Sequence, residues 1–308
     1  MTVTSQSSPS KNPDGQKPNT SGVQSWTWRG FNLRYRVEGE GTPLILLHGF
    51  GASLDHWRKN IPTLAESYRV YAIDLLGFGQ SEKPAMGYSL ELWERMLWDF
   101  LEEIIQEPAF VVGNSIGALL SLMMIAHKPD ICLGGILLNV AGGLNHRPEE
   151  LNPPLRVMMG TFSKVMSLPI VGNIVFNQVR RRSQIKRTLR QVYGNREAVT
   201  DELVEYLYQP SCDQGAQKVM AAILTAPPGP KVEELLPSVR KPLLVLWGEA
   251  DPWTPIAASQ QFQDAVDNPP HPDAPVQFQA IPETGHCPHD ERPEIVNEAI
   301  LNWLSELA

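Results

Sequence analysis

The chain has 308 residues, of which 42% are hydrophobic and 19% charged, and this composition excludes a fibrous or wholly disordered protein. A formal net charge of −8 argues against a nucleic-acid partner, because such a surface repels a phosphate backbone. Three scattered cysteines are too few for a disulfide framework or a paired-thiol zinc site. We therefore expect a cytoplasmic globular protein without a structural metal.

The N-terminal segment is polar and lacks the apolar core of a secretory signal. We interpret residues 1–24 as a disordered tail. A cleaved transit peptide is the alternative, and the absence of any arginine before Arg29 argues against it. No later stretch contains the roughly 18 uninterrupted apolar residues that a membrane span needs.

Strand-like and helix-like segments alternate along most of the chain. Residues 26–39 alternate apolar with polar side chains around a glycine turn, which is typical of strands. Near-continuous apolar runs, typical of parallel strands buried on both faces, then occur at residues 43–50, 69–75, 109–115, 132–142, 242–251 and 275–281. Helical patterns lie between and after them at residues 53–67, 88–105, 116–127 and 291–307. This alternation predicts an α/β fold with a mostly parallel, doubly wound sheet and ligands at the carboxyl ends of its strands.

A largely helical stretch, residues 143–230, follows the sixth predicted strand and interrupts the alternation. We predict a helical cap there, on a core formed by residues 25–142 and 231–308. The cap sequence carries a net charge of +4, and residues 155–192 contain eight basic and no acidic residues. Its apolar segments could line a pocket for a lipophilic chain. Alternatively, they pack on the core while the arginines are solvated.

A GxSxG pattern, Gly113-Asn114-Ser115-Ile116-Gly117, follows an apolar strand and opens an apolar helix. This context predicts a nucleophile elbow, in which a serine turns sharply out of the strand and small neighbours avoid a clash. A chance match in a glycine-rich turn is the alternative interpretation. Ser115 is therefore the candidate nucleophile.

A serine hydroxyl needs a base to remove its proton, and that base needs a carboxylate to orient it. Asp251 ends a strand in WGEADPWTP, and His286 follows the last strand in ETGHCPHDE, which gives the order Ser, Asp, His along the chain. We predict Ser115, Asp251 and His286 as a catalytic triad. Glu249 stays open as an alternative acid, because it lies two residues before Asp251.

Acyl transfer also needs donors for the oxyanion of the tetrahedral intermediate, and backbone N–H groups supply them at low reorganisation cost. We expect this oxyanion hole to be formed by the N–H groups of Ile116, directly after the nucleophile, and Phe50, in the loop LHGFG. Gly49 and Gly51 let that loop bend toward the substrate. We interpret His48 and Asp74 as side chains that fix loops rather than as catalysts.

These motifs together resemble those of a known superfamily. Residues 26–308 resemble the α/β-hydrolase superfamily through LHGFGAS, DLLGFGQS, GNSIG, LWGEADPWTP and ETGHCPHDERP. Within it, HWRKNIP, LLNVAG and GHCPHDERPE resemble the chlorophyll dephytylase and pheophytinase branch of plants and cyanobacteria, although Ala118 stands where that branch usually has glycine. The resemblance implies an α/β-hydrolase fold, the triad Ser115, Asp251 and His286, a phytyl ester of chlorophyll or pheophytin as substrate, and a location at the thylakoid membrane.

We expect a serine hydrolase that cleaves a lipophilic carboxylic ester through an acyl-enzyme, without a cofactor or catalytic metal. The basic, apolar cap leads us to expect peripheral contact with an anionic membrane. Haloalkane dehalogenase and epoxide hydrolase activities are disfavoured, because they need a carboxylate nucleophile. The alternatives are a perhydrolase of the non-heme haloperoxidase type, a carbon–carbon bond hydrolase, and a small-molecule receptor with little turnover.

Overall fold

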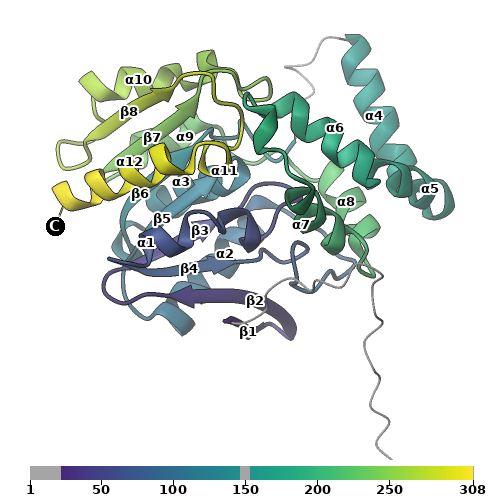
Figure 1. The fold of residues 1–308 in the computed structure, drawn as a ribbon, viewed down its shortest axis with the longest axis horizontal. Helices are drawn as coiled ribbons and strands as arrows, with labels where there is room; N and C mark the ends of the chain where they lie inside the picture. Colours follow the sequence, from purple (N-terminus) through teal and green to yellow (C-terminus); the bar gives the residue numbers. More distant parts are fainter. Residues whose placement is uncertain (1–21, 146–152, 308) are drawn as a thin grey trace, which may run out of the picture.

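The computed structural model describes residues 22–145 and 153–307, which form an eight-stranded sheet with helices packed around it (Figure 1). The strand order is β1-β2-β4-β3-β5-β6-β7-β8. β1 and β2 are antiparallel, β2 is antiparallel to β4, and the other pairings are parallel, which confirms the predicted sheet. The strands are β1 Val23–Trp28, β2 Phe31–Glu38, β3 Pro43–Leu47, β4 Arg69–Ile73, β5 Ala109–Asn114, β6 Cys132–Leu138, β7 Leu243–Gly248 and β8 Val276–Ile281.

Two apolar clusters, one on each face, hold the helices of the core against the sheet. These helices are α1 Ile61–Leu64, α2 Leu90–Phe100, α3 Ile116–His127, α9 Val232–Leu235, α10 Gln260–Asp267, α11 Pro288–Glu291 and α12 Pro293–Glu306. Along β3, Ile45 and Leu47 join the cluster with α2 and α3, whereas Leu44 and Leu46 join the cluster with α12. Because successive side chains of a strand point to opposite faces, a strand covered on both faces must be apolar throughout.

The helix expected over residues 53–67 is not continuous. A 3₁₀ turn at Leu54–Trp57 and the short helix α1 take its place. Pro62 lies in the first turn of α1 and has no N–H to donate, so a longer helix cannot run through this position without losing a hydrogen bond. The turn nevertheless buries Trp57 completely against the face of the sheet that carries α12.

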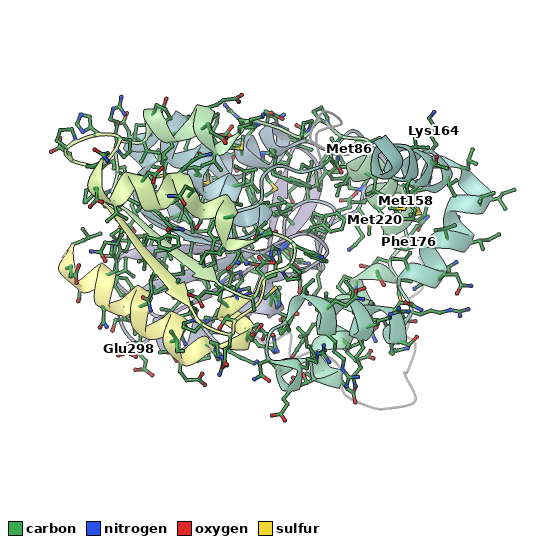
Figure 2. All side chains as sticks on the ribbon, turned by 90° about the horizontal axis from the view of Figure 1, so that it is seen from above. Met86, Met158, Lys164, Phe176, Met220 and Glu298 are labelled. Atoms are coloured by element: carbon green, nitrogen blue, oxygen red, sulfur yellow. The ribbon has the colours of Figure 1, made fainter. Side chains whose placement is uncertain are left out.

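The insertion after β6 is helical throughout most of its described length, as predicted. Its helices are α4 Pro153–Ser167, α5 Pro169–Val179, α6 Arg182–Val192, α7 Asp201–Ser211 and α8 Ala216–Leu224. They lie together at one end of the molecule in both Figure 1 and Figure 2. The predicted tail, residues 1–24, falls almost entirely outside the described residues, and β1 already begins at Val23. No helix in the described part of the chain is long and apolar enough to cross a bilayer.

His48 and Asp74 fix the loops that follow β3 and β4, which confirms their predicted role. The Nδ1 atom of His48 lies 2.8 Å from the carbonyl oxygen of Gly49, and its Nε2 accepts a hydrogen bond from the N–H of Leu75. One carboxylate oxygen of Asp74 accepts a hydrogen bond from the N–H of Leu54 at 2.7 Å. Burial lowers the pKa of His48 to about 4, so the ring is neutral and can accept as well as donate.

A buried polar cluster joins the segment HWRKNIP to the segment GHCPHDERP. The hydroxyl of Tyr193, from the cap, donates to Asp290 at 2.9 Å and lies 3.0 Å from Nε2 of His56. Arg58 forms an ion pair with Asp290 at 2.8 Å, and the Asp290 side chain is fully buried. His289 lies against the ring of His56 and has no hydrogen-bond partner on either ring nitrogen among the described residues. The two segments therefore meet through side chains that shield one another from water.

The buried histidines predict that acid destabilises the fold. Burial lowers the pKa of His56 to about 4 and lowers that of His289 well below its ordinary value. Between about pH 6.5 and about pH 4 the unfolded chain therefore binds protons that the native state excludes, so the free energy of unfolding decreases as the pH falls. The expected slope is about 1.4 kcal/mol per pH unit for each such histidine.

Urea unfolding at a series of pH values measures this slope, with His289→Phe as the matched variant. The substitution retains an aromatic ring beside Trp57 and removes no hydrogen bond, since His289 makes none within the described structure. We expect a shallower dependence of unfolding free energy on pH in the variant. Equal slopes in the variant and the wild type would contradict the prediction.

Candidate active site

Ser115 lies in a sharp turn between β5 and α3, with φ of 59° and ψ of −120°. A Cβ added to Gly113 would lie 2.2 Å from the carbonyl carbon of Gly117, and one added to Gly117 would lie 2.3 Å from the carbonyl oxygen of Leu47. Both positions therefore need glycine for reasons of space. A positive φ is unfavourable for serine and persists only where the surrounding backbone enforces it.

The structure brings Ser115, His286 and Asp251 together from the ends of three different strands. The Nε2 atom of His286 lies 2.9 Å from the Oγ of Ser115, and its Nδ1 lies 2.6 Å from an oxygen of Asp251. All three residues are less than a tenth exposed. Since an ionised carboxylate can only accept, Nδ1 carries the proton and Nε2 is left to accept from the serine hydroxyl.

Hydrogen bonds hold Asp251 in its ionised form. Burial alone would raise its pKa, but the hydrogen bonds from His286, the Thr254 hydroxyl and the Trp253 N–H together outweigh that effect and lower the pKa. The N–H groups of Trp253 and Thr254 donate to one oxygen at 2.8 and 3.1 Å. Glu249, the alternative acid, is exposed, whereas Asp251 contacts the imidazole.

Two asparagines that the sequence analysis did not single out support the site. Asn139 follows β6 with φ of 43°, donates to Asp251 at 2.7 Å and accepts from the N–H of Gly248 at 2.9 Å. Asn114 donates to the carbonyl oxygen of His286 at 2.9 Å. The sequence signal that could have identified Asn139 is its position, because it ends an apolar strand at the same sheet edge as Ser115 and Asp251.

One expected oxyanion donor, Ile116, directly follows the serine in sequence, and the other, Phe50, lies in a loop that passes close to it. Ile116 is the first residue of α3, where an N–H has no acceptor within the helix and the helix dipole favours negative charge. Phe50 follows β3 in a loop that passes close to the serine, because a Cβ added to Gly49 would lie 3.2 Å from the Cβ of Ser115. The Phe50 side chain is partly exposed and meets the ring of Phe78 edge-on.

The cap is hydrogen-bonded directly to the loop that carries His286. The carbonyl oxygen of Val192, the last residue of α6, accepts from the N–H of His286 at 2.8 Å. The carboxylate of Glu291 accepts from the N–H groups of Gly194 and Asn195 in the cap, and from that of Gly285 in the loop. One buried carboxylate thus ties the end of α6 to the residue before the imidazole.

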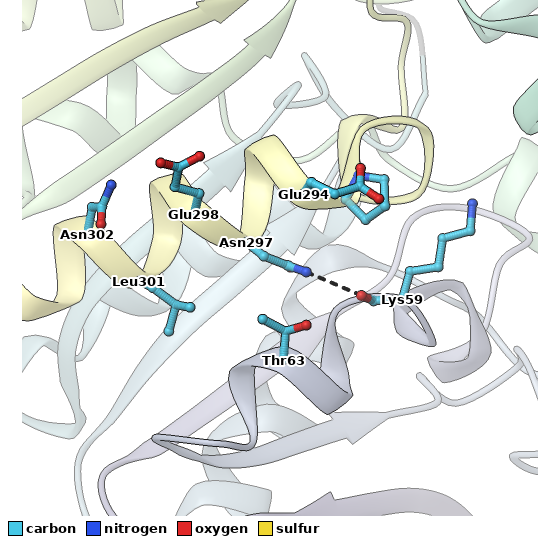
Figure 3. A pocket seen from close by; sticks show the side chains of 8 residues that line it. Lys59, Thr63, Glu294, Asn297, Glu298, Leu301 and Asn302 are labelled. Carbon is cyan, nitrogen blue, oxygen red and sulfur yellow. Dashed lines mark hydrogen bonds between the residues drawn. The ribbon is translucent and has the colours of Figure 1, made fainter.

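Open grooves on the surface lie away from this constellation. One of about 520 Å³ runs between Lys59 and α12, where Asn297 donates to the carbonyl oxygen of Lys59 (Figure 3). Another, of about 500 Å³, is lined by Gly194 and Arg292 among others. Neither is lined by Ser115. Within residues 22–145 and 153–307, no cluster of three or more His, Cys, Asp or Glu residues could hold a metal ion.

Named relatives resemble the chain over most of its length. It is 26% identical to the chloroplastic pheophytinase of Arabidopsis thaliana over 303 residues, which cover 86% of this chain and 61% of that relative. It is 31% identical to the 2-hydroxymuconate semialdehyde hydrolase of Pseudomonas sp. strain CF600 over 249 residues, which cover 77% of this chain and 80% of that enzyme.

Solved structures and a family model agree with the observed topology. The crystal structure of a serine hydrolase involved in carbazole degradation matches with a TM-score of 0.73 at 25% identity, covering 92% of this chain and 98% of that one. A family model described as the alpha/beta hydrolase fold matches residues 42–293. The chain therefore belongs to the α/β hydrolase fold family.

Proposed function

We propose that the protein is a serine hydrolase that cleaves a carboxylic ester through an acyl-enzyme. The observation that carries this proposal is the continuous chain of contacts from the Oγ of Ser115 through His286 to Asp251, at 2.9 and 2.6 Å. Such a chain lets an imidazole remove the serine proton at the moment of attack and keeps it correctly oriented.

In the proposed reaction the Oγ of Ser115 attacks the ester carbonyl carbon while Nε2 of His286 takes its proton. The N–H groups of Phe50 and Ile116 donate to the oxyanion of the tetrahedral intermediate. His286 then protonates the departing alcohol, which leaves the acyl group on Ser115. A water molecule, deprotonated by the same Nε2, attacks the acyl carbon and releases the acid. Protonation of the departing alcohol returns His286 to its neutral form, so that it can deprotonate the water.

Asp251 stabilises the imidazolium that forms in both halves of this reaction. Asn139 and Thr254 each donate to the same oxygen of Asp251 that contacts His286. These bonds fix the orientation of the Asp251 carboxylate and favour its ionised form. Removing such a donor would leave the carboxylate free to rotate. Asn139 therefore acts on the reaction only through Asp251, as a positioning residue.

We propose a lipophilic ester, such as the phytyl ester of chlorophyll or pheophytin, as the substrate. The aromatic ring of Trp253 is 56% exposed and lies 5.1 Å from the imidazole of His286, and Phe50 is 37% exposed. These rings offer an apolar surface beside the reacting atoms, which suits an aliphatic or macrocyclic group. The likeness to pheophytinase supports this substrate class.

Carbon–carbon bond hydrolysis is the second candidate, because several relatives are hydrolases of that kind. One is named for 2-hydroxy-6-oxo-6-(2'-aminophenyl)hexa-2,4-dienoic acid, which carries a carboxylate. The exposed aromatic rings of Trp253 and Phe50 beside the triad, together with the likeness to pheophytinase, make the ester the preferred substrate.

Ser115→Ala should abolish hydrolysis of a p-nitrophenyl ester while the protein stays folded, because alanine cannot form the acyl-enzyme. Steady-state turnover and circular dichroism measure the two effects. Wild-type labelling by a fluorophosphonate serine probe, with steady turnover, separates an enzyme from a receptor of the same fold. Near-wild-type turnover in the alanine variant would contradict the triad.

Asp251→Asn should reduce kcat by about 10⁴-fold, because an amide in contact with Nδ1 favours the wrong imidazole tautomer. Glu249→Gln is the matched control, since it makes the same chemical change two residues away on an exposed side chain. We expect the control to stay close to wild type in kcat. A larger loss of kcat in Glu249→Gln than in Asp251→Asn would identify Glu249 as the acid of the triad.

The substrate class is tested by incubating the protein with pheophytin and, separately, with a ring-cleavage dienoate. Phytol release, measured by mass spectrometry and absent in Ser115→Ala, is the expected result. Turnover of the dienoate alone would transfer the assignment to carbon–carbon bond hydrolysis. Turnover of p-nitrophenyl esters without phytol release would retain the esterase and reject the phytyl ester.

A further inference from the structure

An exposed apolar surface covers the outer helices of the cap. Seven large hydrophobic side chains between residues 157 and 179 are exposed, and Ile170 is 77% exposed. We call this set the cap face; it consists of Val157, Met158, Leu168, Ile170, Val171, Ile174 and Val179. Exposed apolar side chains gathered on two helices in contact, α4 and α5, rather than scattered singly over the molecule, indicate an interaction site.

Helix α5 carries apolar side chains on both its inner and its outer side. Phe176 is buried in a small cluster with Met166 and Ala216, and Figure 2 shows Phe176 beside Met220 between the cap helices. Ile170 and Ile174 lie on the exposed side of the same helix. No residue from Pro169 to Val179 is charged. The polar residues of α5 are the uncharged Asn173, Asn177 and Gln178, all exposed, so its outer side combines neutral polar and apolar side chains.

Basic side chains occur on the same part of the cap as the cap face, on α4, at the junction of α5 and α6, and on α6. Lys164, Arg181 and Arg187 are exposed and form no ion pair among the described residues, and Figure 2 shows Lys164 projecting from α4. In contrast, Arg182 pairs with Glu205 and Lys186 pairs with Asp201, both on α7. The structure therefore reduces the basic run of the sequence to a smaller set of cations without an ion pair among the described residues.

We infer that the cap face docks on an anionic bilayer. Free cations attract anionic headgroups, and the apolar side chains of α5 then enter the boundary between headgroups and acyl chains. At 1.5 Å per residue, α5 is about 16 Å long, which is too short to span the hydrocarbon core and long enough to lie in its surface. This inference does not depend on the reaction that the protein catalyses.

A second copy of the chain fits this surface less well. A twofold dimer through the cap face would bring two copies of the same cationic set, Lys164, Arg181 and Arg187, to one interface. Like charges at an interface cost affinity, and no acidic side chain on α4, α5 or α6 offers compensation within the described residues. An anionic bilayer satisfies both the charge and the apolar side chains at once.

Co-sedimentation with vesicles tests the inference directly. The vesicles contain phosphatidylcholine with or without phosphatidylglycerol, and the salt concentration is varied. We expect wild-type protein to bind the anionic vesicles at low salt and to dissociate as salt rises, because screening shortens the reach of surface charge to about 10 Å at 0.1 M.

Two cap variants and one control separate the contributions. Changing Lys164, Arg181 and Arg187 together to Gln should weaken partitioning roughly 10- to 100-fold. Ile170→Ser with Ile174→Ser should also weaken it, with the salt dependence retained. Changing Arg29, Arg95 and Arg240 together to Gln alters the net charge equally but on the core, and should leave partitioning within a few-fold of wild type. Turnover of a soluble ester shows that each variant is folded.

Four results would overturn the inference. Equal binding to zwitterionic and anionic vesicles, or equal loss in the cap and core charge variants, would remove the role of the cap cations. Absence of vesicle binding by a folded wild type would reject the bilayer as partner. A wild-type dimer in lipid-free buffer that the Ile170→Ser, Ile174→Ser variant dissociates would assign the cap face to self-association.

Discussion

The close packing of backbone around Ser115 is the constraint on which the whole site depends. α3 can begin directly after β5 only because Gly117 passes within contact of the carbonyl oxygen of Leu47, and the same approach sets the loop after β3 beside the serine. The unfavourable φ of Ser115 is the conformational cost of this arrangement. Parallel pairing of β5, β6 and β7 then brings Asn139 and Asp251 to the same edge.

Much of this architecture follows from the sequence, because its signals are local. Continuous apolar runs identify the parallel strands, and an apolar helix directly after GNSIG identifies the elbow, since both patterns reflect which side chains can be buried or must be small. The three candidate triad residues could be chosen because each follows a strand and parallel strands end at one edge. The order of the strands in the sheet, in contrast, depends on long-range pairing that no local pattern records.

Sequence reasoning fell short where a residue's role depends on a distant partner. Asn139 has no special local signal apart from its place at the end of a strand, and its importance becomes visible only with Asp251 at 2.7 Å. The basic run of residues 155–192 likewise contains no acidic residue, whereas in the fold α7 supplies acidic partners to Arg182 and Lys186. Pro62 carries a local signal against a helix that is continuous over residues 53–67.

The hydrogen bond from the N–H of His286 to the carbonyl oxygen of Val192 attaches one end of the cap to the catalytic loop. The end of α6 is part of the frame that holds the imidazole, because Val192 and Glu291 both engage the backbone there. A rigid-body swing of all five cap helices would therefore pull the base away from the serine. On the opposite side of the cap, α4 and α5 pack mainly on each other and on α8. Displacement of α4 and α5 would therefore leave the imidazole in place, whereas displacement of α6 would not.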